Sequence, residues 1–285
     1  MNHVPQLCLG TAQFGLPYGI TNHSGQVKED EVTRILTLAG SSGIELLDTA
    51  QAYGSAETVV GRCWPSNAPR RLISKLPAGA DRHTWEEQFL LTLQRLKAPK
   101  LDTFLLHRAS DLLAPDGDSL LAWLEDLRFR GLTDRIGVSI YDSSDLDGLP
   151  LDRLQVVQLP LSVYDQRLVL DGTFNRLLDL GIKVHARSVL LQGLLIQSPQ
   201  RWPQHLSAAF IDHHSRWLDD LLKNGLSPLV GALRYFRSSI AIEAVLVGVV
   251  SYHQLAQILD AWTHAEFLPS VSPFSWSWNN VFDLD

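Results

Sequence analysis

Four ionisable side chains lie at or just after short apolar runs in the N-terminal part of the chain. Asp48, Lys75 and His107 each end such a run, and Tyr53 follows Asp48 in the next loop. If these runs are parallel strands of one barrel, the residues at their carboxyl ends point into the active site. We therefore expect Asp48, Tyr53, Lys75 and His107 to converge there as a catalytic group.

Each of these residues also has an ordinary structural interpretation when it is taken alone. An Asp at the end of a strand can cap a helix, and Tyr53 with Gly54 can form a turn. A single Lys is usually solvated, and a His after an apolar strand is often a core residue with its hydrogen bonds made. The arrival of all four at three consecutive strand ends favours the catalytic interpretation. A buried Lys75 would also need a carboxylate partner, which Asp48 supplies.

Together the four residues favour one kind of acid–base chemistry. A free Tyr phenol has a pKa of about 10, too high for a good acid near neutral pH. The Lys75 ammonium would lower the pKa of Tyr53, while Asp48 would keep that ammonium charged and oriented. His107 could donate a hydrogen bond to a carbonyl oxygen. The group suits protonation of that oxygen while a hydride reaches the carbonyl carbon. No metal site is expected, because the histidines are scattered without ligand spacing.

The elements that must position these residues alternate regularly. Short β-rich runs and helical patterns follow one another about eight times in 285 residues, which predicts an α/β fold, a (β/α)8 TIM barrel. A doubly wound open sheet is the competing architecture, but no G-x-G-x-x-G turn follows the first run. Without an internal repeat or a linker, residues 1–285 are expected to form a single domain. The predicted strands are 6–9, 46–48, 72–75, 103–107, 136–140, 156–159, 183–188 and 245–249.

The helical patterns between the runs carry start and stop signals. Thr84 precedes the pattern over 85–96, and Glu87 follows Thr84 by three residues, which is the spacing of a capping box. Gly131 and Gly181 stand where two other helices should end.

Two connections depart from the regular alternation. The segment 142–150 is too short and too rich in Gly and Pro for a full helix, so the fifth crossover should be reduced. Residues 194–240 are correspondingly long. They should hold at least two helices, one near 208–222 and one near 229–236.

Composition limits the partners and the compartment. A formal net charge of −7 and a pI near 5.8 argue against binding to nucleic acid or to an anionic membrane. The first residues do not show the basic region followed by an apolar stretch that marks a secretory signal peptide. No run of 18 or more apolar residues, the length of a membrane-spanning helix, is present. Cys8 and Cys63 lie among apolar residues and are expected to be buried, reduced thiols. We therefore expect a cytoplasmic protein with no nucleic-acid or membrane partner.

At this point the sequence resembles the aldo-keto reductase family, in register over nearly the whole chain. The most specific segment is Leu47-Asp-Thr-Ala-Gln-Ala-Tyr-Gly54, followed by Lys75 and His107. The first strand begins almost at once, as in the bacterial branch of the family without an N-terminal hairpin. The other matching segments are 7–15, 73–75, 104–107, 136–139, 157–158, 187–188, 192–193 and 247–248.

The resemblance implies an NAD(P)(H)-dependent oxidoreductase that interconverts an aldehyde or ketone, such as a sugar, and its alcohol. It makes Tyr53 the general acid/base, with Lys75 and Asp48 tuning it and His107 orienting the substrate. The implied cofactor is NADP or NAD, and the family favours NADP. Ser139 and Gln158 match the positions that hold the nicotinamide carboxamide. The 187–195 loop and the 248–258 segment match those that hold the pyrophosphate and adenosine. The residues implied to bind the cofactor are Ser139, Gln158, Arg187, Ser188, Gln192, Gly193, Gly248, Ser251 and Gln254.

Three positions depart from the family pattern. Ile140 stands where an Asn usually provides a carboxamide contact. Arg187 stands where many members have a Tyr that stacks on the nicotinamide, although a guanidinium can also stack on a ring. The segment 248–258 has no Lys or Arg to grip the 2′-phosphate of NADP, and Gln254 lies about where an Arg often does. NAD use therefore stays open, unless an Arg of the 234–237 segment supplies that contact.

Two other functions stay open at this stage. The barrel could bind the nucleotide and act as a regulatory protein with little turnover, as some channel-associated barrel relatives do. It could instead be an isomerase or lyase with a Schiff base on Lys75, although a Lys beside Asp48 should stay charged rather than nucleophilic.

The substrate pocket is expected to draw on aromatic and polar side chains from several loops. Aromatic rings beside polar groups would suit a sugar or another polyhydroxylated aldehyde, and a hydrophobic aldehyde or ketone stays open. Ordinary packing is the alternative interpretation of the aromatic residues. The residues expected to contribute are Phe14, Tyr18, His83, Trp85, Arg108, Asp111, Trp276 and Trp278.

Overall fold

The computed structural model describes residues 5–66, 68–202, 206–237, 241–265 and 273–276. In these residues eight parallel strands pair in chain order, and β1 also pairs with β8, which closes them into a barrel. This confirms the predicted (β/α)8 TIM barrel. The strands are β1 (Gln6–Gly10), β2 (Leu46–Asp48), β3 (Arg71–Leu76), β4 (Leu101–Leu106), β5 (Thr133–Ser139), β6 (Val156–Pro160), β7 (Lys183–Arg187) and β8 (Ala244–Gly248).

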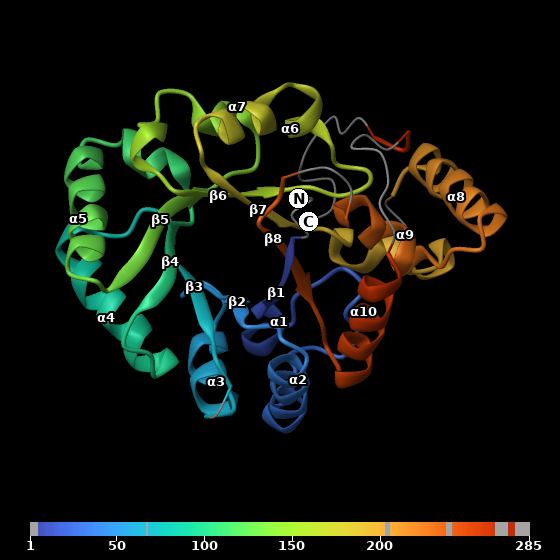
Figure 1. The fold of residues 1–285 in the computed structure, drawn as a ribbon, viewed down its shortest axis with the longest axis horizontal. Helices are drawn as coiled ribbons and strands as arrows, with labels where there is room; N and C mark the ends of the chain where they lie inside the picture. The colour runs from blue at the N-terminus through green and yellow to red at the C-terminus, as the bar shows by residue number, and fades with distance from the viewer. Residues whose placement is uncertain (1–4, 67, 203–205, 238–240, 266–272, 277–285) are drawn as a thin grey trace.

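Helices connect the strands and surround the barrel (Figure 1). The long connection between β7 and β8 carries α8 and α9, as predicted, and α8 lies farthest out from the strands in Figure 1. No helix in the described part of the chain is long and apolar enough to cross a membrane. The helices are α1 (Ala12–Gly15), α2 (Glu29–Ser41), α3 (Ala56–Cys63), α4 (Trp85–Leu96), α5 (Gly117–Phe129), α6 (Arg167–Leu170), α7 (Thr173–Asp179), α8 (Ala208–Lys223), α9 (Pro228–Arg234) and α10 (Tyr252–His264).

The predicted interruptions of this pattern are present. Between β5 and β6 the chain forms two short 3-10 turns, Ser143–Leu146 and Leu151–Arg153, so the fifth crossover is reduced. Helices α5 and α7 end just before Gly131 and Gly181, which have φ of 71° and 74°. Glycine adopts this left-handed conformation at low cost, and it therefore ends both helices.

The predicted capping box at α4 is wrong. The Thr84 side chain accepts no hydrogen bond from the helix backbone. Its hydroxyl donates to the Asp81 carbonyl oxygen at 2.8 Å and accepts from the Gln88 amide at 2.6 Å. A 3-10 turn over Arg82–Thr84, capped by the Asp81 carboxylate, comes directly before α4. Because the Thr84 hydroxyl bonds within that turn, it does not cap α4.

Alternate side chains of each strand lie in different layers, as the β pleat requires. One set forms the helix-facing core, and the other fills the inside of the barrel. Asp48, Lys75 and His107 each come two residues after a member of the interior layer, so the pleat carries them to the inside of the carboxyl end. Cys8 belongs to this layer, whereas Cys63 is partly exposed and not buried as predicted. The interior layer is Cys8, Leu46, Ile73, Leu105, Val156, Ala244 and Leu246.

Charged residues lie together at the opposite, amino end of the barrel. Arg135 lies 2.7 Å from the Glu243 carboxylate and also pairs with Asp102. Arg71 lies 2.7 Å from Asp102, and His185 lies 3.2 Å from Glu243. Each of the two carboxylates thus has a cationic partner, which offsets the cost of placing them in a partly buried site.

Candidate active site

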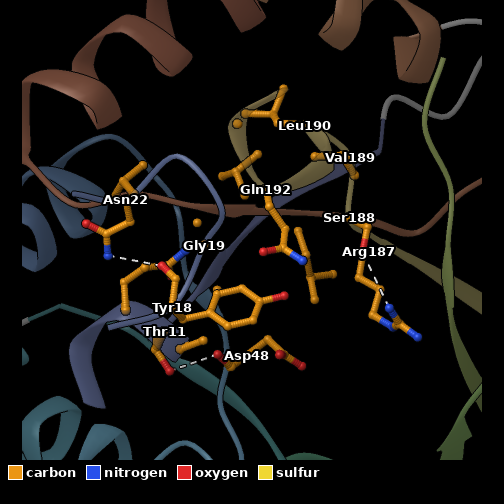
Figure 2. Close-up of a pocket in the computed structure, with 18 of the residues that line it drawn as sticks. Thr11, Tyr18, Gly19, Asn22, Asp48, Arg187, Ser188, Val189, Leu190 and Gln192 are labelled. Atoms are coloured by element: carbon orange, nitrogen blue, oxygen red, sulfur yellow. Dashed lines mark hydrogen bonds between the residues drawn. The ribbon is translucent and has the colours of Figure 1, made fainter. Parts of the chain in front are cut away.

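A cavity opens at the carboxyl ends of the strands (Figure 2). Its empty space, counted with the part open to solvent, is about 1350 Å³. Asp48, Tyr53 and His107 line it. Lys75 does not line the cavity itself but donates a hydrogen bond to Asp48. Of the residues predicted to bind a cofactor, those that line this cavity are Ser139, Gln158, Arg187, Ser188, Gln192, Gly193, Gly248 and Gln254.

A buried ion pair joins the ends of β2 and β3. The Lys75 Nζ lies 2.7 Å from both carboxylate oxygens of Asp48 and 2.9 Å from the Thr49 carbonyl oxygen. The two side chains are only 1% and 4% exposed. Burial alone would lower the pKa of Lys75, but the attraction of Asp48 outweighs it and the pKa is raised. Lys75 is therefore a charged ammonium with three oxygen partners.

Gln158 extends this network to β6. Its side-chain Nε2 donates to the Asp48 Oδ2 at 2.8 Å, a bond that the sequence did not predict. Gln158 is completely buried, and its Oε1 has no hydrogen-bond partner in the described part of the chain. A buried acceptor without a partner costs free energy. This oxygen therefore fits an N–H donor brought in by a ligand.

Tyr53 lies in the loop between β2 and α3, with its ring centroid 5.1 Å from the Lys75 ammonium. The loop packs closely on α1, since a Cβ at Gly15 would lie 1.8 Å from the Tyr53 carbonyl oxygen. Burial raises the pKa of the Tyr53 phenol; Lys75 and Arg187 lower it less than burial raises it. Lys75 thus lowers the pKa of Tyr53 as expected, but burial, which was not weighed, outweighs it and the net shift is upward. The phenol holds its proton at neutral pH, which is the form that a proton donor needs.

His107 faces Tyr53 from the end of β4. The two rings meet edge to face with centroids 6.0 Å apart. Burial, reinforced by the positive charge of Lys75, lowers the pKa of His107 to about 4. The imidazole is therefore neutral near pH 7 and has one N–H to donate. Within the described residues, no group of three or more His, Cys, Asp or Glu side chains is placed to hold a metal ion.

Arg187 ends β7 and lines the same cavity. Its guanidinium carbon lies 4.0 Å from the centroid of the Tyr141 ring. Its Nη2 donates to the Ile140 carbonyl oxygen at 2.9 Å, and its Nη1 lies 3.4 Å from the Ser188 hydroxyl. In the view of Figure 2, Arg187 lies across the pocket from Tyr18. The contact with Tyr141 was not predicted, and it places a ring of the protein itself on the guanidinium.

The loop after β7 turns sharply beside the cavity and joins the loop after β1. Leu191, Gln192 and Gly193 have φ of 45°, 52° and 96° in succession. The Gln192 Oε1 accepts from the Ile20 backbone at 3.1 Å, and the Thr21 hydroxyl donates to the Gln192 carbonyl oxygen at 2.9 Å. A Cβ at Gly193 would lie 2.0 Å from the Thr21 hydroxyl. The close approach of the two loops therefore requires glycine at this position.

The start of α10 already has protein partners for several backbone donors. The Ser251 hydroxyl accepts from the Gln254 backbone at 3.2 Å, and the Gln254 Oε1 accepts from Val250 at 2.9 Å. The Glu31 carboxylate accepts from the Tyr252 backbone at 2.6 Å. Gln254 lines the cavity, whereas Ser251 does not and serves as the helix cap. Glu31 is also paired with Arg34 at 2.8 Å, and the Arg34 guanidinium carbon lies 5.1 Å from the Tyr252 ring centroid. At this helix start, several of the donors that a phosphate would need are therefore already bonded to the protein.

Most residues predicted for the substrate pocket lie elsewhere. Tyr18 does line the cavity (Figure 2). Phe14 and Trp85 are buried in the core, because large apolar rings gain more by packing there than by facing a wet cavity. Arg108 pairs with Asp111. Trp278 lies outside the described residues, and the residues that do not line the cavity are Phe14, His83, Trp85, Arg108, Asp111 and Trp276.

Several residues that line the cavity were not predicted. Thr11 and Gln13 follow the end of β1, and Tyr141 follows the end of β5. The strand-end rule applied to those two strands would have found all three. Asn22 and Gln197 come from longer loops, for which the sequence offers no comparable signal.

Comparisons with known proteins agree with this geometry. The sequence profile of the aldo/keto reductase family matches residues 6–271. The structure is similar to aldo-keto reductase AKR11C1 from Bacillus halodurans in its holo form, with 20% identity, a TM-score of 0.75 and coverage of 94% of this chain and 89% of that one. It is also similar to the glycerol dehydrogenase AKR11B4 from Gluconobacter oxydans, with 21% identity, a TM-score of 0.70 and coverage of 90% and 86%.

A third similar structure is an aldo-keto reductase from Klebsiella pneumoniae in complex with NADPH. It has 19% identity, a TM-score of 0.66 and coverage of 91% of this chain and 86% of that one. Among proteins with curated descriptions, none matches this chain. At these identities the similar structures establish a shared fold.

Proposed function

The chain belongs to the aldo/keto reductase family, and from this premise we propose that it interconverts an aldehyde or ketone and its alcohol with NAD(P)(H), using Tyr53 as general acid/base. The observation that carries the proposal is the buried Lys75–Asp48 ion pair beside Tyr53 at the mouth of the barrel. A glycerol dehydrogenase and an enzyme bound to NADPH are among the similar structures. Both support a nicotinamide cofactor, and the first supports a polyhydroxylated substrate.

The chain's own residues fit such a cofactor. The unpartnered Gln158 Oε1 and the buried Ser139 hydroxyl lie on adjacent strands and would hold the nicotinamide carboxamide. The loop over 188–193 and the exposed Gly248 would hold the phosphate-bearing part. When bound, the cofactor supplies the hydride that the carbonyl carbon receives.

Tyr53 completes the reduction by moving a proton. As the carbonyl carbon gains the hydride, the Tyr53 O–H bond breaks and a new O–H bond forms on the substrate oxygen. Loss of the proton turns Tyr53 into a phenolate. The Lys75 ammonium, 5.1 Å from the centroid of the Tyr53 ring, stabilises this negative charge. A proton from solvent then restores the phenol. In the reverse direction the phenolate accepts the alcohol proton.

The other two residues place the reacting groups. Asp48 accepts hydrogen bonds from Lys75 and Gln158, and it therefore keeps the ammonium charged and fixed. Neutral His107 donates its N–H to the carbonyl oxygen and so orients it toward Tyr53. The same network disfavours a Schiff base on Lys75, because its amine is protonated and bonded to three oxygens.

The start of α10 supports NAD over NADP as the cofactor. A 2′-phosphate carries additional negative charge and needs donors or cations. The Gln254 Oε1 is bonded to Val250, and the Glu31 carboxylate accepts from Tyr252. Arg237 donates to the Trp262 carbonyl oxygen and does not line the cavity. The Glu31 carboxylate is also paired with Arg34 at 2.8 Å, so that cation is already engaged, and the carboxylate can accept from a ribose hydroxyl.

Two measurements test the proposal together. The first mixes the purified protein with NADH or NADPH and a panel of sugar, aliphatic and aromatic aldehydes, and follows the absorbance of the reduced nicotinamide. The second titrates each cofactor by fluorescence. We expect binding and turnover, with NADH bound more tightly. Binding without turnover of any aldehyde would contradict the proposal and support a regulatory nucleotide-binding barrel.

A further inference from the structure

The charges around the cavity do not balance. Of the described residues that line it, Asp48 and Arg187 carry formal charges at neutral pH. Asp48 is neutralised by Lys75, whose Nζ lies 2.7 Å from both of its oxygens. The partners of Arg187 are all uncharged, and no described carboxylate pairs with its guanidinium. The cavity therefore has one positive charge in excess, in a chain whose formal net charge is −7.

The neighbours of Arg187 leave this excess charge uncompensated. His107 is neutral and Tyr53 is protonated near pH 7, so neither supplies a negative charge. Tyr53, His107 and Arg187 line the same cavity, and the positive charge of Arg187 contributes to lowering the pKa of both other groups. Arg108, by contrast, pairs with Asp111 at 2.5 Å and lies outside the cavity.

The Arg187 side chain is held in place rather than solvated freely. It is partly buried, stacks on Tyr141 at 4.0 Å and donates to the Ile140 carbonyl oxygen at 2.9 Å. A guanidinium has five N–H donors in a rigid fork that matches a carboxylate or phosphate. Two of them have partners in the described part of the chain, Ile140 and the Ser188 hydroxyl. The remaining donors give a preorganised anion site beside the catalytic group.

We propose that Arg187 selects carbonyl substrates that carry an anionic group, a carboxylate or a phosphate, and binds that group through its guanidinium. The proposal rests on the proposed function, since it names the substrate class of the same site. Tyr53 and His107 hold the carbonyl oxygen, and Arg187 holds the anion at the β7 side of the cavity. A neutral aldehyde of the same shape leaves the charge of Arg187 without a partner and binds less well.

Matched substrate pairs test this selection. One pair is 4-carboxybenzaldehyde and its isosteric amide, 4-formylbenzamide; the other is glyceraldehyde 3-phosphate and glyceraldehyde. The kcat/KM ratio of anionic to neutral substrate is measured for the wild type, Arg187→Gln, Arg187→Lys and the control Arg108→Gln. NADH affinity is titrated for each protein. The first pair reports a carboxylate preference and the second a phosphate preference.

We expect the wild type to prefer the anionic member of at least one pair, and Arg187→Gln to reduce that ratio about 10- to 100-fold, the worth of one hydrogen bond to a charged group. Arg187→Lys should recover part of the ratio, and Arg108→Gln should leave it unchanged. Calorimetry should show benzoate, and not benzamide, binding to the enzyme–NAD complex, with the difference lost in Arg187→Gln.

Two results would overturn the inference. One is turnover of both members of each pair at equal kcat/KM, with the ratio unchanged in Arg187→Gln; the proposed function would then stand without this selectivity. The other is a loss of NADH affinity in Arg187→Gln together with an equal fall in kcat/KM for the anionic and the neutral substrate. That result would make Arg187 a cofactor contact. Absence of turnover with every substrate would instead contradict the proposed function itself.

Discussion

The two ends of this barrel are built from the same strands but use their charges differently. At the amino end, Arg135 connects Asp102 and Glu243, Arg71 pairs with Asp102, and His185 lies 3.2 Å from Glu243. At the carboxyl end, the Lys75–Asp48 pair is complete, but Arg187 lacks an ionic partner among the described residues. Charges paired within the protein hold the barrel together, whereas those left over are available to a ligand.

Removing the Tyr53 hydroxyl should have the largest effect, and only at the carboxyl end. Tyr53→Phe deletes the proton donor while keeping the ring beside Lys75. We expect kcat to fall about 10²- to 10⁴-fold, with cofactor affinity and the unfolding midpoint almost unchanged. Steady-state kinetics and a NADH fluorescence titration measure this. A Tyr53→Phe protein with wild-type kcat would show that another group supplies the proton.

Breaking the amino-end network should cost stability rather than chemistry. Arg135→Leu leaves Asp102 and Glu243 without their shared cation, and its side chain is only 17% exposed. We expect the free energy of unfolding to fall by about 3–5 kcal/mol, as for other broken buried pairs, with KM for the substrate preserved. Urea unfolding measures the loss.

Lys100→Met provides the matched control for Arg135→Leu. It breaks an exposed pair with Asp134, whose side chains are 52% and 50% exposed. This change should cost about 1 kcal/mol or less. Equal losses in the two variants would contradict a structural role for the amino-end network.

The amino end should also set part of the acid sensitivity of the fold. Burial raises the pKa of Glu243, but His185 and Arg135 outweigh it and lower the pKa from 4.5 to about 2. A carboxyl with a lowered folded pKa stabilises the fold above its unfolded pKa, and this stabilisation is lost as pH falls through the window from about 4.5 to about 2. The shift corresponds to roughly 3 kcal/mol.

Unfolding free energies measured near pH 6 and near pH 3 check this assignment with Glu243→Gln as the comparison. The variant should be less stable than the wild type at the higher pH and should lose less stability on acidification. If Glu243→Gln loses as much unfolding free energy on acidification as the wild type, Glu243 does not contribute to the acid sensitivity.

A change of cofactor preference should be the smallest effect and should again be confined to the carboxyl end. Gln254→Arg introduces a guanidinium at a position that lines the cavity. It should tighten NADPH binding about tenfold relative to NADH, the effect of roughly 1.4 kcal/mol from one charge-assisted contact. Glu31→Gln should act in the same direction, because it removes the carboxylate beside Tyr252. Fluorescence titrations with both cofactors measure the ratio, and an unchanged ratio in both variants would place the 2′-phosphate elsewhere.

The sequence predicted the barrel, and the meeting of four ionisable side chains at its mouth, for a shared physical reason. Strand ends in a parallel barrel meet at one edge, and the pleat of period two then fixes which side chains point inward. Asp48 and Lys75 therefore meet whatever the details of the loops. The spacing of Thr84 and Glu87 predicted a capping box that does not form. The Thr84 hydroxyl instead bonds to the Asp81 carbonyl oxygen and the Gln88 amide.

Other features depend on contacts between strands or loops that no single segment encodes. The bond from Gln158 to Asp48 spans the barrel, and Arg187 stacks on Tyr141 from a different strand end. The direction of the Tyr53 pKa shift depends on how deeply the phenol is buried compared with its distance from the cations. These quantities follow from the closed barrel and its packing, so residue order alone could not predict them.

Following the hydride itself tests whether this cavity reduces carbonyl groups. The protein is given NADH carrying deuterium at the transferable position of nicotinamide C4, together with 4-carboxybenzaldehyde, and the alcohol is analysed by mass spectrometry. We expect one deuterium on the former carbonyl carbon, formed with wild-type protein and almost absent with Tyr53→Phe in the same time. A folded protein that binds NADH but transfers no deuterium to any aldehyde would contradict the claim that this cavity reduces carbonyl groups.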